Sequence, residues 1–128
     1  MRRTCQTALS TLIEHSPAVQ FASLATVDGR SFAHANAVTH EADPQRSAAL
    51  MSSLLGLIES FSREALKSNT LYNITATEHG SIILVRVPSA GRMHTLCLCT
   101  DMSENVAMTL RTSLDTATLL AELIDSPV

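Results

Sequence analysis

The sequence predicts a single α/β (α+β) domain in which helices cover both faces of a five-stranded, mainly antiparallel sheet. Two observations predict this fold class: segments with helical spacing of apolar residues alternate with short strand-like segments, and two of those strands are apolar at every position. The two apolar strands are Ile82–Val85 and Leu96–Cys99, which indicates that both faces of the sheet are covered there. With 128 residues, 45% of them hydrophobic and 16% charged, the chain has room for one core. We therefore expect one domain over residues 1–128.

The first third of the chain predicts one helix and a hairpin. Apolar residues recur at helical spacing as one narrow stripe that consists of Cys5, Ala8, Leu9, Leu12 and Ile13. Pro17 ends this pattern, so residues 1–17 form a helical extension before a core over residues 18–125. A strand over 19–27 then runs up to the hairpin signal Asp28-Gly29, and Ser31–Thr39 is the return strand.

The remainder of the chain predicts a long helix, three strands and a last helix. The long helix begins at Asp43-Pro44, where Asp43 can cap free backbone N–H groups, and runs to about Lys67. Strands follow over 70–78, 81–87 and 92–100, separated by turn residues. The last helix is expected to start at Asp101, because Glu104 completes a capping-box pattern. The predicted order is therefore α-β-β-α-β-β-β-α.

The long second helix carries more apolar surface than one sheet can bury. On a helical wheel its apolar residues spread over about half of the circumference, compared with a stripe of roughly 100° for packing on one sheet. We assign to the sheet the residues Leu50, Leu54, Leu57 and Phe61. The exposed flank is then Met51 and Leu55, with Leu66 as a further candidate. Self-association would bury this flank, and the alternative is that the first helix or a loop covers it within one chain.

Composition argues against nucleic acid and against membrane insertion. The net charge is −3, and the chain has one Tyr, three Phe and no Trp, so it offers no basic field and few stacking platforms for bases. No run approaches the roughly 20 apolar residues of a membrane helix. Three cysteines without framework spacing favour reduced thiols, and hence a cytoplasmic protein.

No motif in the sequence predicts catalysis, a metal or another cofactor. Cys97 and Cys99 share one strand face, but a closed tetrahedral site needs four ligands, and His94 points to the opposite face. The phosphate loop of nucleotide-binding proteins and the serine nucleophile elbow are both missing from the sequence. The carboxylates have structural explanations: Asp28 in a turn, Asp43 and Asp101 as helix caps, and Glu59 and Glu64 on a solvated helix face. We therefore expect a protein that is not an enzyme.

The element order, with the residues that carry it, resembles the Roadblock/dynein light-chain family and its profilin-like fold. The resemblance covers Val19 to Leu123 and rests on the residues Val27-Asp28-Gly29-Arg30, Ala48-Ala49 and Leu54-Leu55 in the long helix, Gly80, and Ile82-Ile83-Leu84-Val85. It implies homodimers or heterodimers in which the long helices pack together and the sheets join through the third strand. Here that edge is Thr70–Glu78. The interface residues we predict are Met51, Leu55, Ile58 and Leu66 on the helix, with Leu71, Asn73 and Thr75 on the strand.

The resemblance also implies a function. Bacterial and archaeal relatives often regulate or scaffold small Ras-like GTPases, so we expect a non-catalytic, dimeric, protein-binding module with such a partner. A small-molecule sensor and a structural scaffold without a GTPase partner are the alternatives. Arg30 in the first hairpin turn is a candidate arginine finger, and the alternative is a solvated turn residue. The sequence leaves open which GTPase binds, whether its hydrolysis is stimulated, and whether a second family member replaces one copy.

Overall fold

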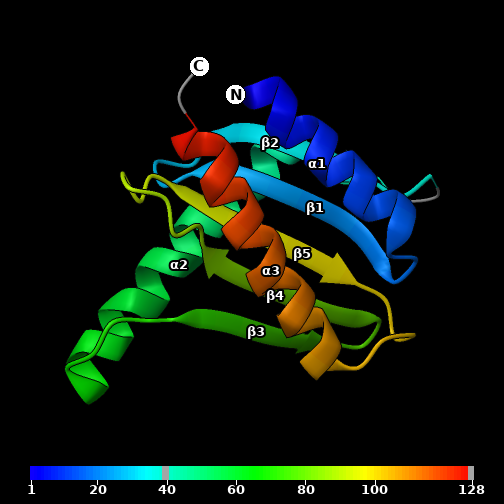
Figure 1. Ribbon diagram of the computed structural model, residues 1–128. Helices are drawn as coiled ribbons and strands as arrows, with labels where there is room; N and C mark the ends of the chain where they lie inside the picture. Colours follow the sequence, from blue (N-terminus) through cyan, green and yellow to red (C-terminus); the bar gives the residue numbers. More distant parts are fainter. Residues whose placement is uncertain (39–40, 127–128) are drawn as a thin grey trace.

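A five-stranded antiparallel sheet forms the centre of the computed structural model, which describes residues 1–38 and 41–126 (Figure 1). The strands are β1 (Val19–Thr26), β2 (Ser31–Asn36), β3 (Tyr72–Thr77), β4 (Gly80–Arg86) and β5 (His94–Thr100). They are arranged in the order β2-β1-β5-β4-β3, and every neighbouring pair is antiparallel. The predicted fold class and element order are confirmed. The return strand ends at Asn36, before the predicted Thr39, which lies outside the described residues.

Three helices cover the two faces of the sheet. Helices α1 (Arg2–His15) and α3 (Val106–Asp125) lie on one face, and α2 (Pro44–Leu66) lies on the other (Figure 1). None of the helices among the described residues is long and apolar enough to cross a membrane.

The predicted start of the last helix at Asp101 is wrong. Asn105 caps α3 instead, because its side chain accepts a hydrogen bond from the backbone N–H of Met108 at 2.9 Å. Asp101 holds the preceding turn by accepting from the backbone N–H of Ser103 at 2.9 Å. Both residues are good N-caps, so the sequence pattern alone favoured the first of two competing candidates.

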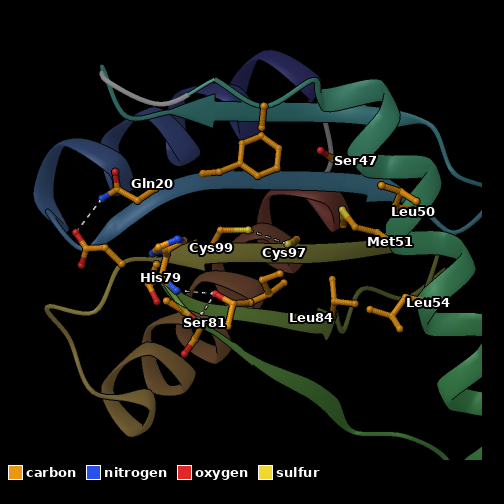
Figure 2. Close-up of a pocket in the computed structure, with 17 residues that line it drawn as sticks. Gln20, Ser47, Leu50, Met51, Leu54, His79, Ser81, Leu84, Cys97 and Cys99 are labelled. Atoms are coloured by element: carbon orange, nitrogen blue, oxygen red, sulfur yellow. Dashed lines mark hydrogen bonds between the residues drawn. The ribbon is translucent and has the colours of Figure 1, made fainter.

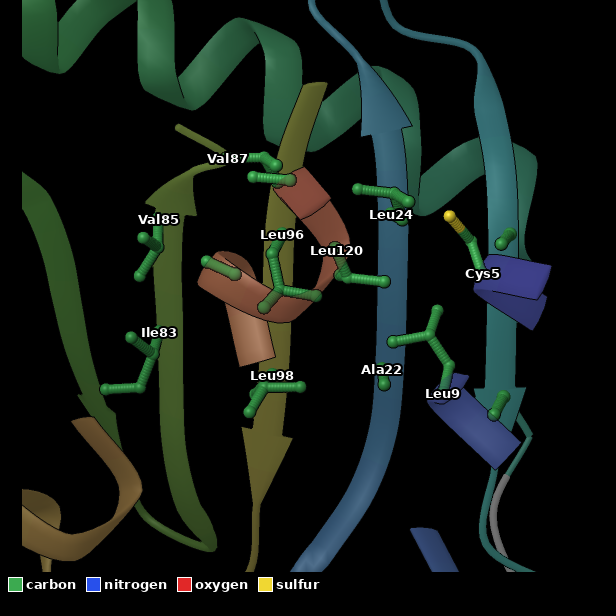
Figure 3. Packing of buried hydrophobic residues seen from close by; sticks show 14 of the residues in the cluster. Cys5, Leu9, Ala22, Leu24, Ile83, Val85, Val87, Leu96, Leu98 and Leu120 are labelled. Carbon is green, nitrogen blue, oxygen red and sulfur yellow. The ribbon is translucent and has the colours of Figure 1, made fainter. Parts of the chain in front are cut away.

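The main core lies between the sheet and the α1/α3 layer. Alternate residues of the three central strands point into it and meet side chains from both helices (Figure 3). Its largest fully buried members are Leu9, Leu24, Ile83, Leu96, Leu98 and Leu120, whereas the equally buried Leu84 faces α2. The apolar residues on that side of the central strands are thus buried in one cluster, while the polar residues His94 and Thr100 occupy the two ends of β5.

The two edge strands of the sheet differ in how their outward-facing backbone groups are paired. At the β2 edge, the side chain of Gln6 on α1 pairs with the backbone of His34: Nε2 donates to the carbonyl oxygen, and Oε1 accepts from the N–H at 3.0 Å. At the opposite edge, β3 pairs with β4, and its other side carries no strand in the part of the chain that the structure describes.

Polar contacts fasten α2 to the β1–β2 hairpin. Asp43 caps the helix by accepting from the N–H of Gln45 at 3.0 Å. The Gln45 amide accepts from the N–H of Ser31 at 3.1 Å and donates to the carbonyl oxygen of Gly29 at 3.0 Å. About two turns later, Ser52 Oγ donates to the carbonyl oxygen of Val27 at 2.8 Å. These contacts fix the rotation of α2 about its own axis.

The faces of α2 are the reverse of the predicted ones. Met51 and Leu55 are each only 6% exposed and pack towards the sheet, whereas Leu57 and Phe61 are each 70% exposed. The sheet-facing side also carries the small residue Ala48 and the polar residues that hold the helix in place. Hydrophobicity could not orient this helix, because apolar residues cover half of its circumference.

Leu55→Asp is therefore expected to unfold the chain. The substitution removes a buried side chain and places a carboxylate without a partner between α2 and the sheet, at a cost of about 3–5 kcal/mol. The measurement is urea unfolding followed by circular dichroism, at a concentration low enough for monomers. Leu57→Asp on the exposed side is the matched control, with an expected change below about 1 kcal/mol. Equal midpoints for the two variants would contradict the observed helix orientation.

Candidate interaction surface

A cavity of about 460 Å³ lies between the first half of α2 and the sheet (Figure 2). Its floor consists of side chains from three strands: Phe21, Ile82, Leu84, Cys97 and Cys99. Its wall is Leu50, Met51 and Leu54 of α2. Most of its polar residues lie at one end, where Gln20 Nε2 donates to Asp101 Oδ2 at 3.2 Å and His79 belongs to the β3–β4 turn, and Ser47 lines the cavity from α2. The cavity is thus an apolar hollow with a polar rim.

Four large apolar side chains form an outer stripe along α2. The outer stripe consists of Leu50, Leu54, Leu57 and Phe61, which are 63, 37, 70 and 70% exposed. Their spacing of four, three and four residues places them on one helix face. Leu50 and Leu54 also form the wall of the cavity, so stripe and cavity are one continuous apolar surface. A surface of this kind on a small protein marks an interaction site.

Strand β3 borders this surface with a free edge. Asn73 and Thr75 point to the α2 side, where Thr75 Oγ1 donates to Asn73 Oδ1 at 3.0 Å. Tyr72 and Ile74, which are 39 and 38% exposed, point to the other side. Their partners across the β3–β4 ladder are Val85 and Ile83, on the side of α1 and α3. A strand whose outer edge is unpaired and which carries apolar side chains can pair with a strand of another chain.

Two thiols lie on the floor of the cavity. Cys97 Sγ and Cys99 Sγ are 3.8 Å apart on the same face of β5. Their hydrogen bond, together with burial, raises the pKa of Cys97 well above its usual value, and the same bond lowers the pKa of Cys99. His94 lies on the opposite face against Phe32, with ring centroids 4.7 Å apart. Among the residues that the structure describes, no three His, Cys, Asp or Glu side chains gather as a metal site.

Glu59 is a structural residue that the sequence prediction misplaced. It was expected on a solvated face but is only 7% exposed, beneath the second half of α2. Its carboxylate accepts from the N–H of Thr70 at 3.3 Å and lies 3.5 Å from Arg86 Nη2 and 3.6 Å from Arg63 Nη2. Glu59 therefore ties α2 both to the segment before β3 and to β4. The sequence signal for its burial was its position four residues after Leu55, because residues four apart lie on the same face of a helix.

The predicted interface residues fall into two groups. Met51 and Leu55 do not form an exposed flank, because both are buried within the chain. The others remain predictions: Ile58 and Asn73 are half-buried, as is Thr75, while Leu66 and Leu71 are 78 and 80% exposed. The prediction missed the outer stripe because it had placed those four residues against the sheet.

Comparison with solved structures identifies the fold. A comparison with protein-family models finds no match, and a comparison with curated proteins finds none either. The chain is similar to MglB of Myxococcus xanthus, with a TM-score of 0.83 and 13% identity over 99% of this chain and 92% of that one. An MglB structure with a tetrameric arrangement gives a TM-score of 0.81 and 15% identity, over 95% and 88% of the two chains. A Roadblock/LC7 domain from Streptomyces avermitilis gives 0.77 and 16%, over 93% and 96%.

These neighbours and the observed strand order define the class of fold. The chain has the Roadblock/LC7 fold, which confirms the resemblance found in the sequence. At 13–16% identity the likeness concerns the fold. The likeness does not extend to the residues of the outer stripe, the cavity and the β3 edge, which are those of this chain.

Arg86→Met is expected to destabilise the chain by about 1–2 kcal/mol, because it leaves the buried Glu59 carboxylate with one cation fewer. The partial exposure of Arg86 keeps the effect below that of a fully buried pair. Chemical unfolding measures the change. Arg111→Met is the matched control: its ion pair with Asp115 is exposed, so its loss should cost less than about 0.5 kcal/mol. An Arg86 variant as stable as the Arg111 variant would show that Glu59 does not depend on Arg86.

Proposed function

We propose that this chain is a non-catalytic, dimeric protein-binding module that regulates or scaffolds a small Ras-like GTPase. The observation that carries the proposal is the continuous apolar surface formed by the outer stripe and the cavity, beside the free edge of β3, on a Roadblock/LC7 fold. Binding of a partner at this surface would require no catalytic side chain.

Self-association is the first part of the proposal. A monomer exposes four large side chains on one helix face and an open strand edge, and both features favour burial against a second copy. A two-fold dimer is the commonest solution, because each copy presents the same surface to the other. The tetrameric arrangement described for one MglB neighbour supports an assembly of several copies.

The GTPase partner is the second part of the proposal, and it rests on the Roadblock resemblance. The sequence has no phosphate loop, so the partner would supply the nucleotide site. Arg30, the candidate arginine finger, has a side chain that is 80% exposed, and its Nε lies 3.8 Å from Asp28 Oδ2. Such an exposed ion pair costs little to break, so the guanidinium is free to reach a partner.

A small-molecule sensor is the second candidate function, favoured by the volume of the cavity. A space of about 460 Å³ lies within the range of ligand pockets. A thermal-shift screen against a set of metabolites tests this candidate, and stabilisation by an apolar metabolite with a polar end would favour it over the GTPase proposal.

The purified chain is expected to sediment as a dimer at micromolar concentration. Leu57→Asp places a charge in the outer stripe and should shift the chain to 13.7 kDa without loss of helical signal. Leu119→Asp is the matched control, because Leu119 is an exposed leucine of α3, outside the proposed interface. A wild-type chain that sediments only as a monomer would overturn the proposed dimer.

The chain should bind a small Ras-like GTPase but should not bind GTP itself. The test is pull-down with a panel of purified GTPases in GDP-bound and GTP-bound form, together with titration of a fluorescent GTP analogue into the chain alone. Arg30→Ala distinguishes the roles: slower GTP hydrolysis by the bound GTPase indicates an arginine finger, and unchanged hydrolysis with retained binding indicates a scaffold. Tight binding of the analogue to the chain alone would overturn the proposal. Binding of no GTPase in either state would favour the structural scaffold.

A further inference from the structure

Three sulfur-bearing side chains from two elements line the cavity between α2 and the sheet. Cys97 and Cys99 contribute thiols from β5, and Met51 contributes a thioether from α2. All three belong to one apolar cluster or pack against it. Figure 2 shows the two thiols directed towards each other, with Met51 extending from α2 towards the same part of the cavity. A helix and a strand that are far apart in the sequence therefore bring soft donor atoms to one place.

The spacing of the two thiols suits a bridging ion better than a disulfide. Their Sγ atoms are 3.8 Å apart, whereas a disulfide requires about 2.05 Å. Cα atoms two residues apart on a strand are separated by about 6.7 Å, close to the upper limit of about 6.8 Å for a disulfide. Strand β5 is paired on both sides, with β1 and β4, so bending it to bring the sulfur atoms together would cost ladder hydrogen bonds. The structure therefore favours two separate thiols at this position.

The potential ligands at this place are soft. Among the described residues, no third His, Cys, Asp or Glu side chain joins Cys97 and Cys99. Asp101 lies at the polar end of the cavity, where its carboxylate already accepts from Gln20 and Ser103. Zinc prefers four ligands in a closed site, and Mg²⁺ and Ca²⁺ require oxygen ligands. Thiolate and thioether ligands together favour Cu(I), so the chemistry of the site indicates a soft monovalent ion.

The surroundings of the thiols allow an ion to enter and to be held. Cys99 is half-buried, which gives access from the cavity, whereas Cys97 is only 4% exposed. Ser23, the neighbour of Cys97 across the β1–β5 ladder, is completely buried, and its Oγ has no hydrogen-bond partner among the described residues. Directly paired residues have Cβ atoms about 4.5–5.5 Å apart, so this hydroxyl can donate to the Cys97 sulfur once the thiol proton has left. Such a bond to a charged acceptor would offset part of the cost of burying a thiolate.

We propose that Cys97, Cys99 and Met51 form a binding site for one Cu(I) ion. Both thiols release their protons to solvent and bind the ion as thiolates, and the thioether of Met51 is the third ligand, from the side of α2. The ion keeps its oxidation state throughout. The site lies within one chain, so it depends neither on the proposed dimer nor on a GTPase partner. Because its ligands come from α2 and β5, a bound ion would tie the helix to the sheet.

The test is an anaerobic titration of the reduced chain with Cu(I) in competition with bicinchoninate, whose Cu(I) complex is coloured. Wild type should retain one ion per chain. Cys97→Ala and Cys99→Ala should each lower the affinity by at least about a hundredfold, the upper end of the cost of losing an outer-shell partner. Cys5→Ala is the matched control, because Cys5 is a buried thiol in the α1/α3 layer, and it should retain the ion with unchanged affinity. Circular dichroism checks that each variant is folded, and the half-buried Cys99 should tolerate substitution better than Cys97. A wild-type chain that leaves all of the copper with the chelator would overturn the proposal.

Met51→Leu separates the thioether from its contribution to packing. The two side chains are similar in volume, so the fold should be retained while the affinity for Cu(I) falls by about tenfold. Met108→Leu, at an exposed position of α3, is the matched control and should bind Cu(I) as wild type does. One equivalent of Cu(I) should also raise the Tm of wild type more than that of Met51→Leu, because an ion that binds only the folded chain stabilises it. Wild-type affinity in Met51→Leu, or Zn²⁺ bound as tightly as Cu(I), would refute the three-sulfur site.

Discussion

The rotation of α2 about its own axis determines which of its apolar side chains are exposed. The rotation is fixed by polar contacts, in which Gln45 and Ser52 reach the β1–β2 hairpin and Glu59 reaches Thr70 and Arg86. Because those residues occupy the sheet-facing side together with Met51 and Leu55, four other large apolar side chains of the helix are left on the outside. The outer stripe is thus a consequence of how the helix is fastened. Apolar burial alone would favour a different rotation.

The element order and the class of fold could be predicted from the sequence, because they depend on periodicity and turn residues. Pro17, the Asp28-Gly29 turn and the Asp43 cap each act locally, and the structure uses them as expected. The N-cap of α3 was predicted four residues too early, because Asp101 and Asn105 are both competent caps and only the path of the chain decides between them.

The candidate surface was predicted less well, for a physical reason. A helix with apolar residues around half of its circumference has no unique hydrophobic face, so hydrophobicity cannot orient it. The deciding residues are small or polar, and their partners lie far away in sequence: Ser52 bonds to Val27, and Glu59 bonds to Thr70. Leu66 was named as an interface candidate from the wheel, and it is 78% exposed at the end of α2.

The glutamine on α1 that pairs with the β2 edge bears on the size of any assembly. A sheet with two open edges can add copies at both sides and grow into a filament. Here the Gln6 amide occupies the outward-facing N–H and carbonyl of His34, so strand pairing has one productive edge per molecule. In the proposed dimer, growth by edge pairing would therefore terminate after one addition, and α1 would be the element that limits the assembly.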